Sequence, residues 1–194
     1  MKLPCDTIPE AIINAATDSD TDKGYTFIAD DGVNEAFFSF QELADTTARY
    51  AQALVGLGLR RGDRVGLILP QSKDFVFSFL GAMYAGLTPV PLSPPLNVGQ
   101  LGFYLEHIKY ILKAGEASLL VTVPRIKRVM GSLLGGKLQK IITVDDIHVG
   151  PDALAFTPPR ADDIAFIQFT SGSTARPKGV GLTHSNLIAN AHCI

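Results

Sequence analysis

The sequence predicts an α/β protein in which a mostly parallel sheet is covered by helices on both faces. The first observation is a set of short apolar runs without polar alternation, at 65–69, 118–122 and 140–144. Strands of this kind are buried on both faces, as in parallel sheets. The second observation is that segments with helical periodicity alternate with these runs, at 73–85 and 100–114, and such alternation is typical of α/β folds. The third is composition: with 46% hydrophobic and 19% charged residues, the 194-residue chain can bury a sizeable core,.

The first 56 residues predict two helices with a β-hairpin between them. Residues 7–10 are Thr-Ile-Pro-Glu, the pattern of a capping box that opens a helix,. Two apolar runs, 25–28 and 36–38, flank an Asp-Asp-Gly turn and predict the hairpin,. Residues 39–42, Ser-Phe-Gln-Glu, form a second capping box, and the helix that they open is expected to end at Gly56,.

The rest of the chain predicts an edge strand, a further helix and a final strand–loop–strand–helix segment. Run 88–92 contains two prolines, which cannot donate hydrogen bonds, so we expect it at a sheet edge or strand end,. A helix is expected over 124–134. The Gly- and Pro-containing segment 145–163 is interpreted as a linker, which leaves approximately 1–144 as the first α/β part. Within 164–194 the last helix has run barely two turns, so we expect the chain to be a fragment of a longer protein.

Charge and cysteine content narrow the function classes. A net charge of −2 and a pI of about 6.0 give no electrostatic case for nucleic-acid binding,. Cys5 and Cys193 lie at opposite ends of the chain, which is typical of free thiols in a reducing cytoplasm,. The four histidines form no metal motif, and the N-terminal residues form no signal peptide,.

One uncharged stretch, 75–103, is long enough to span a bilayer,. Glycines and prolines interrupt it, and proline breaks a helix. We therefore expect a buried helix, a turn and a buried strand instead of a membrane span. The interrupting residues are Gly81, Gly86, Pro89, Pro91, Pro94 and Pro95.

The densest group of chemically useful residues lies at 169–179, Phe-Thr-Ser-Gly-Ser-Thr-Ala-Arg-Pro-Lys-Gly. Small residues allow backbone amides to converge on an anion, and hydroxyls and a lysine add further donors. We interpret the segment as a phosphate cradle; the alternative is a Ser/Gly-rich surface loop that binds nothing. It is not a Walker A loop, because Pro177 precedes the lysine and Gly179 follows it,. The predicted phosphate-binding residues are Thr170, Ser171, Gly172, Ser173, Thr174 and Lys178.

This loop resembles the phosphate-binding signature of the adenylate-forming superfamily, Thr-Ser-Gly-Ser-Thr-Gly-x-Pro-Lys-Gly. The one departure is Ala175, where the family has glycine. If that position needs a positive φ, alanine costs about 1 kcal/mol or more. The resemblance extends in order from about Thr7 to the end of the chain. The segments that carry it are 38–43, 57–65, 69–72, 81–86 and 89–92.

The resemblance implies that residues 1–194 are the N-terminal portion of an AMP-binding domain, with 164–194 as its phosphate-loop hairpin and the start of the next helix. Gln168 and the Pro-Leu-Ser-Pro-Pro run at 91–95 look most like fatty acyl-AMP ligases. Such an enzyme would use ATP and Mg²⁺ to adenylate a fatty acid and pass it to an acyl carrier protein or a polyketide or peptide synthase. The magnesium ligand, the adenine contacts and the C-terminal lysine of the family are expected outside this chain, so residues 1–194 alone are predicted to be inactive.

Other interpretations stay open. Within the superfamily they are an acyl-CoA synthetase and a peptide-synthetase adenylation domain. Two interpretations belong to other functional classes. One is a non-catalytic adenylation-like scaffold, which Ala175 would favour, and the other is an unrelated nucleotide-binding switch. His184 is interpreted as a helix-start residue, and Tyr and Phe at helical spacing as core. Five basic residues are interpreted as a solvated face, with an acidic carrier protein as the alternative partner: Arg125, Lys127, Arg128, Lys137 and Lys140,.

Overall fold

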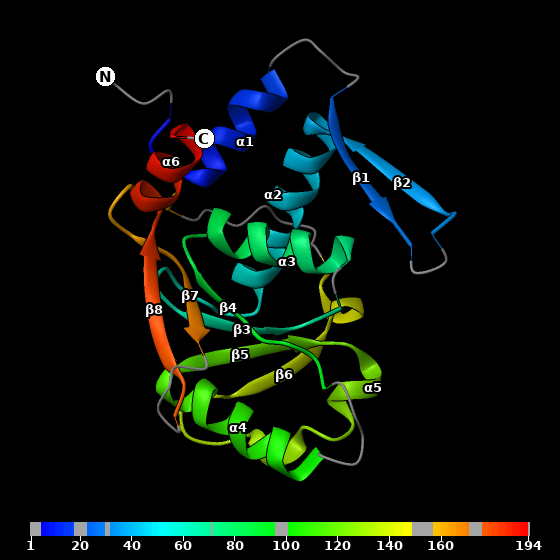
Figure 1. The fold of residues 1–194 in the computed structure, drawn as a ribbon, viewed down its shortest axis with the longest axis vertical. Coiled ribbons are helices and arrows are strands. Elements are labelled where there is room, and N and C mark those ends of the chain that lie inside the picture. The colour runs from blue at the N-terminus through cyan, green and yellow to red at the C-terminus, as the bar shows by residue number, and fades with distance from the viewer. Residues whose placement is uncertain are drawn as a thin grey trace.

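The computed structural model confirms the α/β prediction. A four-stranded parallel sheet in the order β4-β3-β5-β6 carries helices on both faces (Figure 1). Its strands are β3 (Arg64–Ile68), β4 (Thr88–Pro91), β5 (Ala117–Thr122) and β6 (Lys140–Thr143). The structure describes residues 5–17, 23–29, 32–70, 72–95, 101–148, 157–170 and 176–193.

Two hydrophobic clusters lie on opposite faces of this sheet. Helices α2 (Phe40–Gly56) and α3 (Lys73–Tyr84) cover one face, and α4 (Leu101–Ala114) covers the other. Successive side chains of a strand point to opposite faces. Leu119 therefore belongs to the α2/α3 cluster and Leu120 to the α4 cluster, and neither is more than 2% exposed. This two-sided burial is why the strands are apolar runs without alternation.

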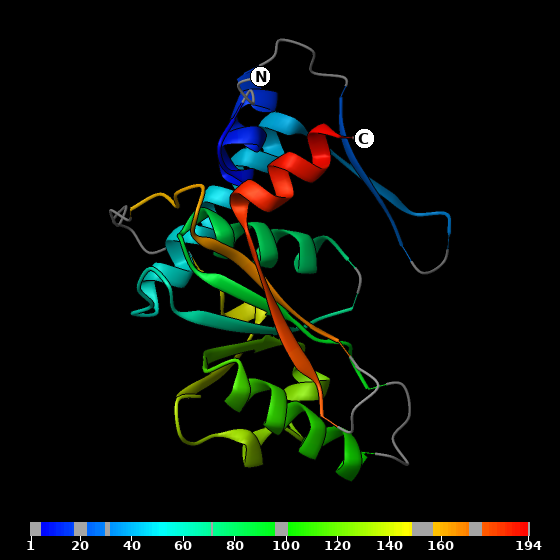
Figure 2. The ribbon, with the colours of Figure 1, turned by 60° about the vertical axis from the view of Figure 1, so that its left-hand side comes forward.

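The N-terminal elements also match the prediction. They are α1 (Ile8–Thr17) and the antiparallel hairpin of β1 (Gly24–Ile28) and β2 (Glu35–Ser39), which projects from the body in Figure 2. The capping box of α2 is complete: the Ser39 amide donates to the Glu42 carboxylate (2.8 Å), and the Glu42 amide donates to the Ser39 hydroxyl (3.2 Å). At α1, the Glu10 amide donates to the Thr7 hydroxyl, but the Glu10 carboxylate accepts from Asp6, one residue earlier than expected.

The predicted helix over 124–134 is wrong in extent. Only α5 (Pro124–Lys127) is α-helical, and a 3₁₀ turn, η2 (Gly131–Leu133), follows it. Val129 and Met130 donate to carbonyls three residues earlier, which tightens the chain,. A glycine at 131 weakens a helix by about 0.5–1 kcal/mol relative to alanine. The predicted linker, 145–163, begins inside a further 3₁₀ turn, η3 (Val144–Asp146), and 149–156 lie outside the described residues. The division into parts stays a prediction.

The edge position expected for 88–92 is confirmed, and its prolines explain the neighbouring layer. Thr88 and Leu92 donate their amides toward β3 (2.9 and 2.8 Å). By strand alternation, the nitrogens of Pro89 and Pro91 face the opposite edge, where they offer no donor. Strand β7 (Ile164–Thr170) lies beside that edge, but among the described strands it pairs only with β8 (Lys178–Thr183), as a separate two-stranded sheet. The Thr88 hydroxyl links the layers by donating to the Ile164 carbonyl (3.3 Å).

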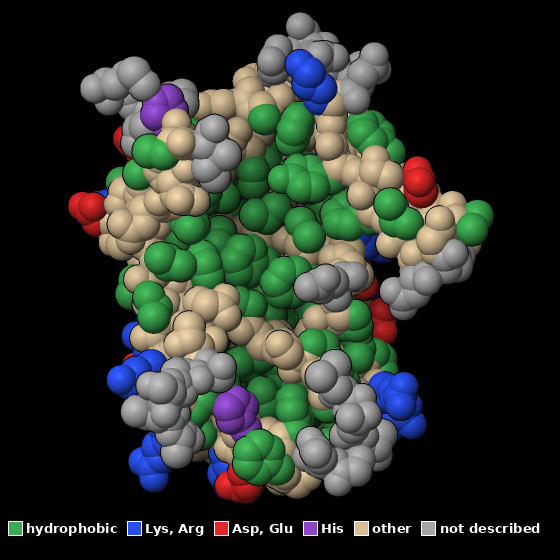
Figure 3. Space-filling view, viewed as in Figure 1, with side chains coloured by type: hydrophobic (Ala, Val, Ile, Leu, Met, Phe, Trp, Pro, Cys, Tyr) green, Lys and Arg blue, Asp and Glu red, His purple; other side chains and the backbone are tan. Residues whose placement is uncertain are grey.

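Ring contacts join the hairpins to the α3 layer. Phe79 of α3 contacts Phe166 of β7 edge-to-face, with centroids 5.4 Å apart, and Phe77 contacts Phe27 and Phe38 of the first hairpin. Apolar side chains gather in the hollow that Figure 3 shows between the two hairpins. These contacts make α3 the element that both hairpins share.

Helix α6 (His184–His192) begins at His184, as the sequence predicted, and this side chain also holds α1. His184 is 1% exposed, and its Nδ1 accepts a hydrogen bond from the Ile8 amide (3.3 Å). The Asp163 carboxylate lies next in this cluster and accepts from the Arg160 amide (2.7 Å) and the Arg61 guanidinium. Burial opposes ionisation of Asp163, but these two donors lower its pKa. The two ends of the described chain therefore meet through a neutral imidazole.

Mild acid should loosen the contact between α1 and α6. Burial lowers the pKa of His184 below its ordinary value of 6.5, although the Asp163 charge acts in the opposite direction. The unfolded chain therefore takes up a proton as the pH falls through 6.5, before the folded chain does, and the free energy of unfolding falls in this window. Urea unfolding at a series of pH values should show this slope in the parent chain and less of it in His184→Gln. The exposed His148→Gln should keep the parent slope; equal slopes in all three would contradict the assignment.

Candidate functional site

The predicted phosphate loop connects β7 to β8 at the turn end of this hairpin. Thr170 is the last residue of β7, Lys178 is the first of β8, and the two are paired in the antiparallel register. The ladder thus holds both ends of the loop together. The other predicted phosphate-binding residues, Ser171 to Thr174, and the departure at Ala175 lie outside the described residues. Their role stays a prediction.

A glycine opposite an aromatic ring fixes the hairpin just before the loop. Gly179 pairs with Phe169, and a Cβ on Gly179 would lie 2.9 Å from the Phe169 ring. The same ring lies close to Gly115, after α4, and packs against the α4 core cluster. The signature glycine at 179 therefore has a local packing reason, because any larger residue would displace Phe169.

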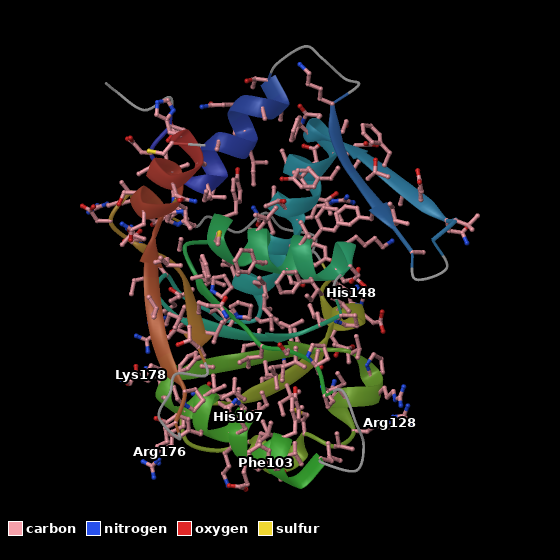
Figure 4. The ribbon with its side chains drawn as sticks, in the orientation of Figure 1. Phe103, His107, Arg128, His148, Arg176 and Lys178 are labelled. Atoms are coloured by element: carbon pink, nitrogen blue, oxygen red, sulfur yellow. The ribbon has the colours of Figure 1, made fainter. Side chains whose placement is uncertain are left out.

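A cation–π contact holds the returning end of the loop to α4. The Arg176 guanidinium lies 5.8 Å from the centre of the Tyr110 ring. Figure 4 shows Arg176 and Lys178 at the same end of the molecule as His107 and Phe103 of α4. Contacts of this type are worth about 0.5–1 kcal/mol at exposed sites. The loop is thus anchored through β7 on one side and through Arg176 on the other.

A cavity of about 780 Å³ opens beside this hairpin end. It lies at the carboxyl edge of the parallel sheet, where α/β proteins bind their ligands. Thr170 is part of its wall, whereas Lys178 is exposed and is not among the lining residues. Three separate segments make the wall: Gln168, Phe169, Thr170 and Pro177 of the hairpin; Pro91, Leu92, Ser93, Pro94 and Pro95 after β4; and Phe103, Tyr104, His107, Ile108 and Ile111 of α4.

The lining of this cavity is mainly apolar with a few polar groups. The Tyr104 hydroxyl donates to the Ser93 carbonyl (2.8 Å), and burial raises the pKa of Tyr104, so the phenol stays protonated and keeps this bond. The imidazole of His107 stacks on Phe103, with centroids 6.4 Å apart. Such a wall suits a ligand with an apolar body and a polar end.

The α4 residues of the cavity were missed by sequence reasoning. Aromatic residues at helical spacing were expected to be core. Tyr104 does pack against the α4 cluster, but it also lines the cavity, and Phe103 is 78% exposed. The signal that could have found them is position: Phe103 and His107 lie one turn apart and outside the apolar side that contains Leu105 and Ile108,.

The described residues contain neither a metal-binding cluster nor a helix suited to span a membrane. No three His, Cys, Asp or Glu side chains gather there in a way that could hold a metal ion. In the same part of the chain, no helix has both the length and the apolar character that crossing a bilayer requires.

Comparison with known proteins identifies the family. The family model of the AMP-binding enzymes matches residues 18–194. A long-chain-fatty-acid–AMP ligase, FadD32 of Mycolicibacterium smegmatis, is 37% identical over 139 residues, which is 66% of this chain and 21% of the relative. A medium-chain-fatty-acid–[acyl-carrier-protein] ligase, JamA of Moorena producens, is 33% identical over 180 residues, which is 88% of this chain and 29% of the relative. Other relatives are coenzyme A ligases, such as feruloyl-CoA synthase.

Solved structures give the same result. A structure from a study of fatty acyl-adenylate ligases of E. coli and L. pneumophila matches with a TM-score of 0.84 and 31% identity, over 95% of this chain and 33% of that one. The chain thus spans between a fifth and a third of the lengths of these proteins. Its fold, signature segments and family match agree, and the chain belongs to the AMP-binding enzymes, the adenylate-forming superfamily.

Proposed function

We propose that residues 1–194 are the N-terminal portion of the AMP-binding domain of a ligase that activates a fatty acid with ATP. One observation carries the proposal: the signature loop begins and ends at a hairpin whose Thr170 borders a mainly apolar cavity at the carboxyl edge of the sheet. That arrangement offers polar donors for phosphates next to an apolar wall for an acyl chain. The names of FadD32 and JamA support a fatty acid as the substrate.

The residues of this chain would stabilise the negative charge that develops on the leaving pyrophosphate during the reaction. In adenylation the carboxylate oxygen forms a bond to the α-phosphorus, the bond from that phosphorus to the bridging oxygen breaks, and pyrophosphate leaves with the extra negative charge. ATP supplies the adenylyl group. The Thr170 hydroxyl, the amides and hydroxyls of 171–174 and the Lys178 ammonium would hold the departing phosphates. Fixed donors and cations aimed at developing charge are a main source of rate acceleration in such transfers.

We further propose an acyl carrier protein, alone or within a polyketide or peptide synthase, as the acceptor of the acyl group. The name of JamA supports this acceptor, and so does the resemblance of Gln168 and 91–95 to acyl-AMP ligases. The coenzyme A ligases among the relatives make an acyl-CoA synthetase the alternative, and a peptide-synthetase adenylation domain is a second. Cys5 and Cys193 are free thiols, which supports the reducing cytoplasm as the location,.

The test is an ATP–pyrophosphate exchange assay on a full-length protein that contains residues 1–194, with a panel of carboxylic acids. We expect exchange that depends on a fatty acid, and thioester formation on holo acyl carrier protein but not on coenzyme A. Residues 1–194 alone should give no exchange. Thioester on coenzyme A would overturn the acceptor and leave the activation step standing. A full-length protein that is inert with every acid would favour the scaffold interpretation.

A further inference from the structure

A second cavity lies next to the candidate site, and nothing so far assigns it a ligand. It has a volume of about 760 Å³ and shares Pro94 and Pro95 with the first cavity. Like the first, it lies at the carboxyl edge of the sheet, because its walls follow β3, β4 and β5. We call it the Arg125–Arg128 trough. Its lining residues are Pro70, Pro94, Pro95, Leu101, Val123, Arg125, Ile126, Arg128 and Val129.

The trough has an apolar floor and a purely basic rim. Arg125 and Arg128 are three residues apart on the α5 turn, so both lie on one side of it,. Both are exposed, and Figure 4 shows Arg128 pointing outward from α5. Figure 3 shows basic side chains at this edge. None of the described residues that line the trough carries a carboxylate.

The two arginines of the rim have no ion-pair partner in the part of the chain that the structure describes. Within the described ranges, neither guanidinium forms an ion pair, whereas Lys127 between them pairs with Asp146 (3.0 Å). The bonds from Thr143 and Lys127 lower the pKa of Asp146 to about 2, so this carboxylate stays ionised and keeps Lys127 occupied. Of the three basic residues at α5, the two on the rim are therefore the ones whose charge has no ion-pair partner among the described residues. Val129, which is 39% exposed, leaves apolar surface uncovered beside it.

We propose that the Arg125–Arg128 trough docks an acidic, amphipathic helix of the acyl carrier protein. The inference rests on the proposed function, which requires the acceptor to reach the neighbouring cavity. Carboxylates on such a helix would pair with the two guanidinium groups, and its apolar side would cover the floor at Ile126 and Val129. This is helix-in-groove recognition with charge-assisted hydrogen bonds at the rim. A trough that shares Pro94 and Pro95 with the first cavity would place the carrier beside the site where the acyl-adenylate forms.

The experiment separates docking from activation in the full-length protein. The double variant Arg125→Glu with Arg128→Glu should raise the KM for holo acyl carrier protein about tenfold or more in low salt. The same variant should leave fatty-acid-dependent ATP–pyrophosphate exchange unchanged. The matched control, Lys109→Glu with Lys113→Glu, makes the same charge change on the exposed side of α4 and should leave the KM near the parent value. In about 0.5 M NaCl the difference between the two double variants should shrink.

Two further measurements make the outcome decisive. Val129→Asn keeps every charge, so it should weaken carrier binding at high salt as well as at low salt. Fluorescence anisotropy can follow the binding of apo acyl carrier protein, so it tests docking without any adenylation. A protein that binds the carrier but adenylates no acid would count against the proposed function and not against docking. Equal carrier affinity in the parent and the Arg125/Arg128 double variant would overturn the proposal. So would a double variant that binds pyrophosphate more weakly but keeps the parent's affinity for the carrier, because the trough would then be a site for a small anion.

Discussion

Replacing Lys178 with methionine should lower fatty-acid-dependent ATP–pyrophosphate exchange in the full-length protein by about 100-fold, the usual effect of removing one donor from developing negative charge. Methionine keeps an aliphatic stem but removes the ammonium group. Lys178 is exposed, at the first position of β8 opposite Thr170. Its loss should therefore change the free energy of unfolding by less than about 0.5 kcal/mol.

The control for this prediction is Lys109→Met, which removes an exposed ammonium group from α4. It should leave the exchange rate at the parent level. Because Lys178 does not line the described cavity, the prediction depends on phosphates that lie at the loop and not deep inside the cavity. Parent-like exchange in Lys178→Met would show that the hairpin end does not hold the phosphates, and the proposed role of the loop would be abandoned.

Gly81→Ala should destabilise the chain by about 2 kcal/mol, within the usual range for overpacking a close contact. Gly81 lies where α3 packs closely against α2. A Cβ there would lie 2.5 Å from the Tyr50 Cβ, 3.2 Å from the Ala51 nitrogen and 3.3 Å from the Thr47 carbonyl oxygen. These are backbone atoms or atoms attached directly to it, so they cannot move aside as a flexible side chain would. Urea unfolding of residues 1–194 measures the change.

The matched variant is Gly102→Ala, also at a helical glycine, where no described atom outside its own helix backbone and chain neighbours lies within 4 Å of the added Cβ. There the methyl group meets open space, and the better helix propensity of alanine should stabilise the chain by about 0.5 kcal/mol. The two variants make the same chemical change, so opposite signs of the change in the free energy of unfolding would arise from packing. A Gly81→Ala variant as stable as the parent would mean that α2 and α3 are farther apart than described.

The strands of the parallel sheet were predictable because each buried strand is a contiguous run of apolar residues. At 118–122 every position but Ser118 is buried, so the apolar run needs no knowledge of its neighbours. The segment after it shows the limit of this reasoning. Ile126, Met130 and Leu133 are all buried in the α4 cluster, at a spacing that suits a helix. The spacing correctly marks a side facing the core, but it cannot distinguish an α-helix from an α-turn followed by a 3₁₀ turn, since both bring these residues inward.

The candidate site was predictable only in part, because its walls come from separate parts of the chain. The signature at 169–179 is contiguous, and its flanking strands were expected. The cavity beside it joins that hairpin to 91–95 and to one side of α4, and no local pattern links those segments. The arginines at 125 and 128 were visible as charges, but their position over an apolar floor depends on how β3, β4 and β5 end at one edge.

The missing donors of Pro89 and Pro91 have a mechanical consequence. Among the described residues no ladder joins β4 to β7, so there the loop-bearing hairpin meets the parallel sheet through side-chain packing and the Thr88 hydroxyl bond. A tilt of the hairpin as a unit would therefore break no main-chain pair of the parallel sheet. Two prolines at a strand edge thus leave the hairpin that carries the predicted phosphate loop as a unit separate from the parallel sheet.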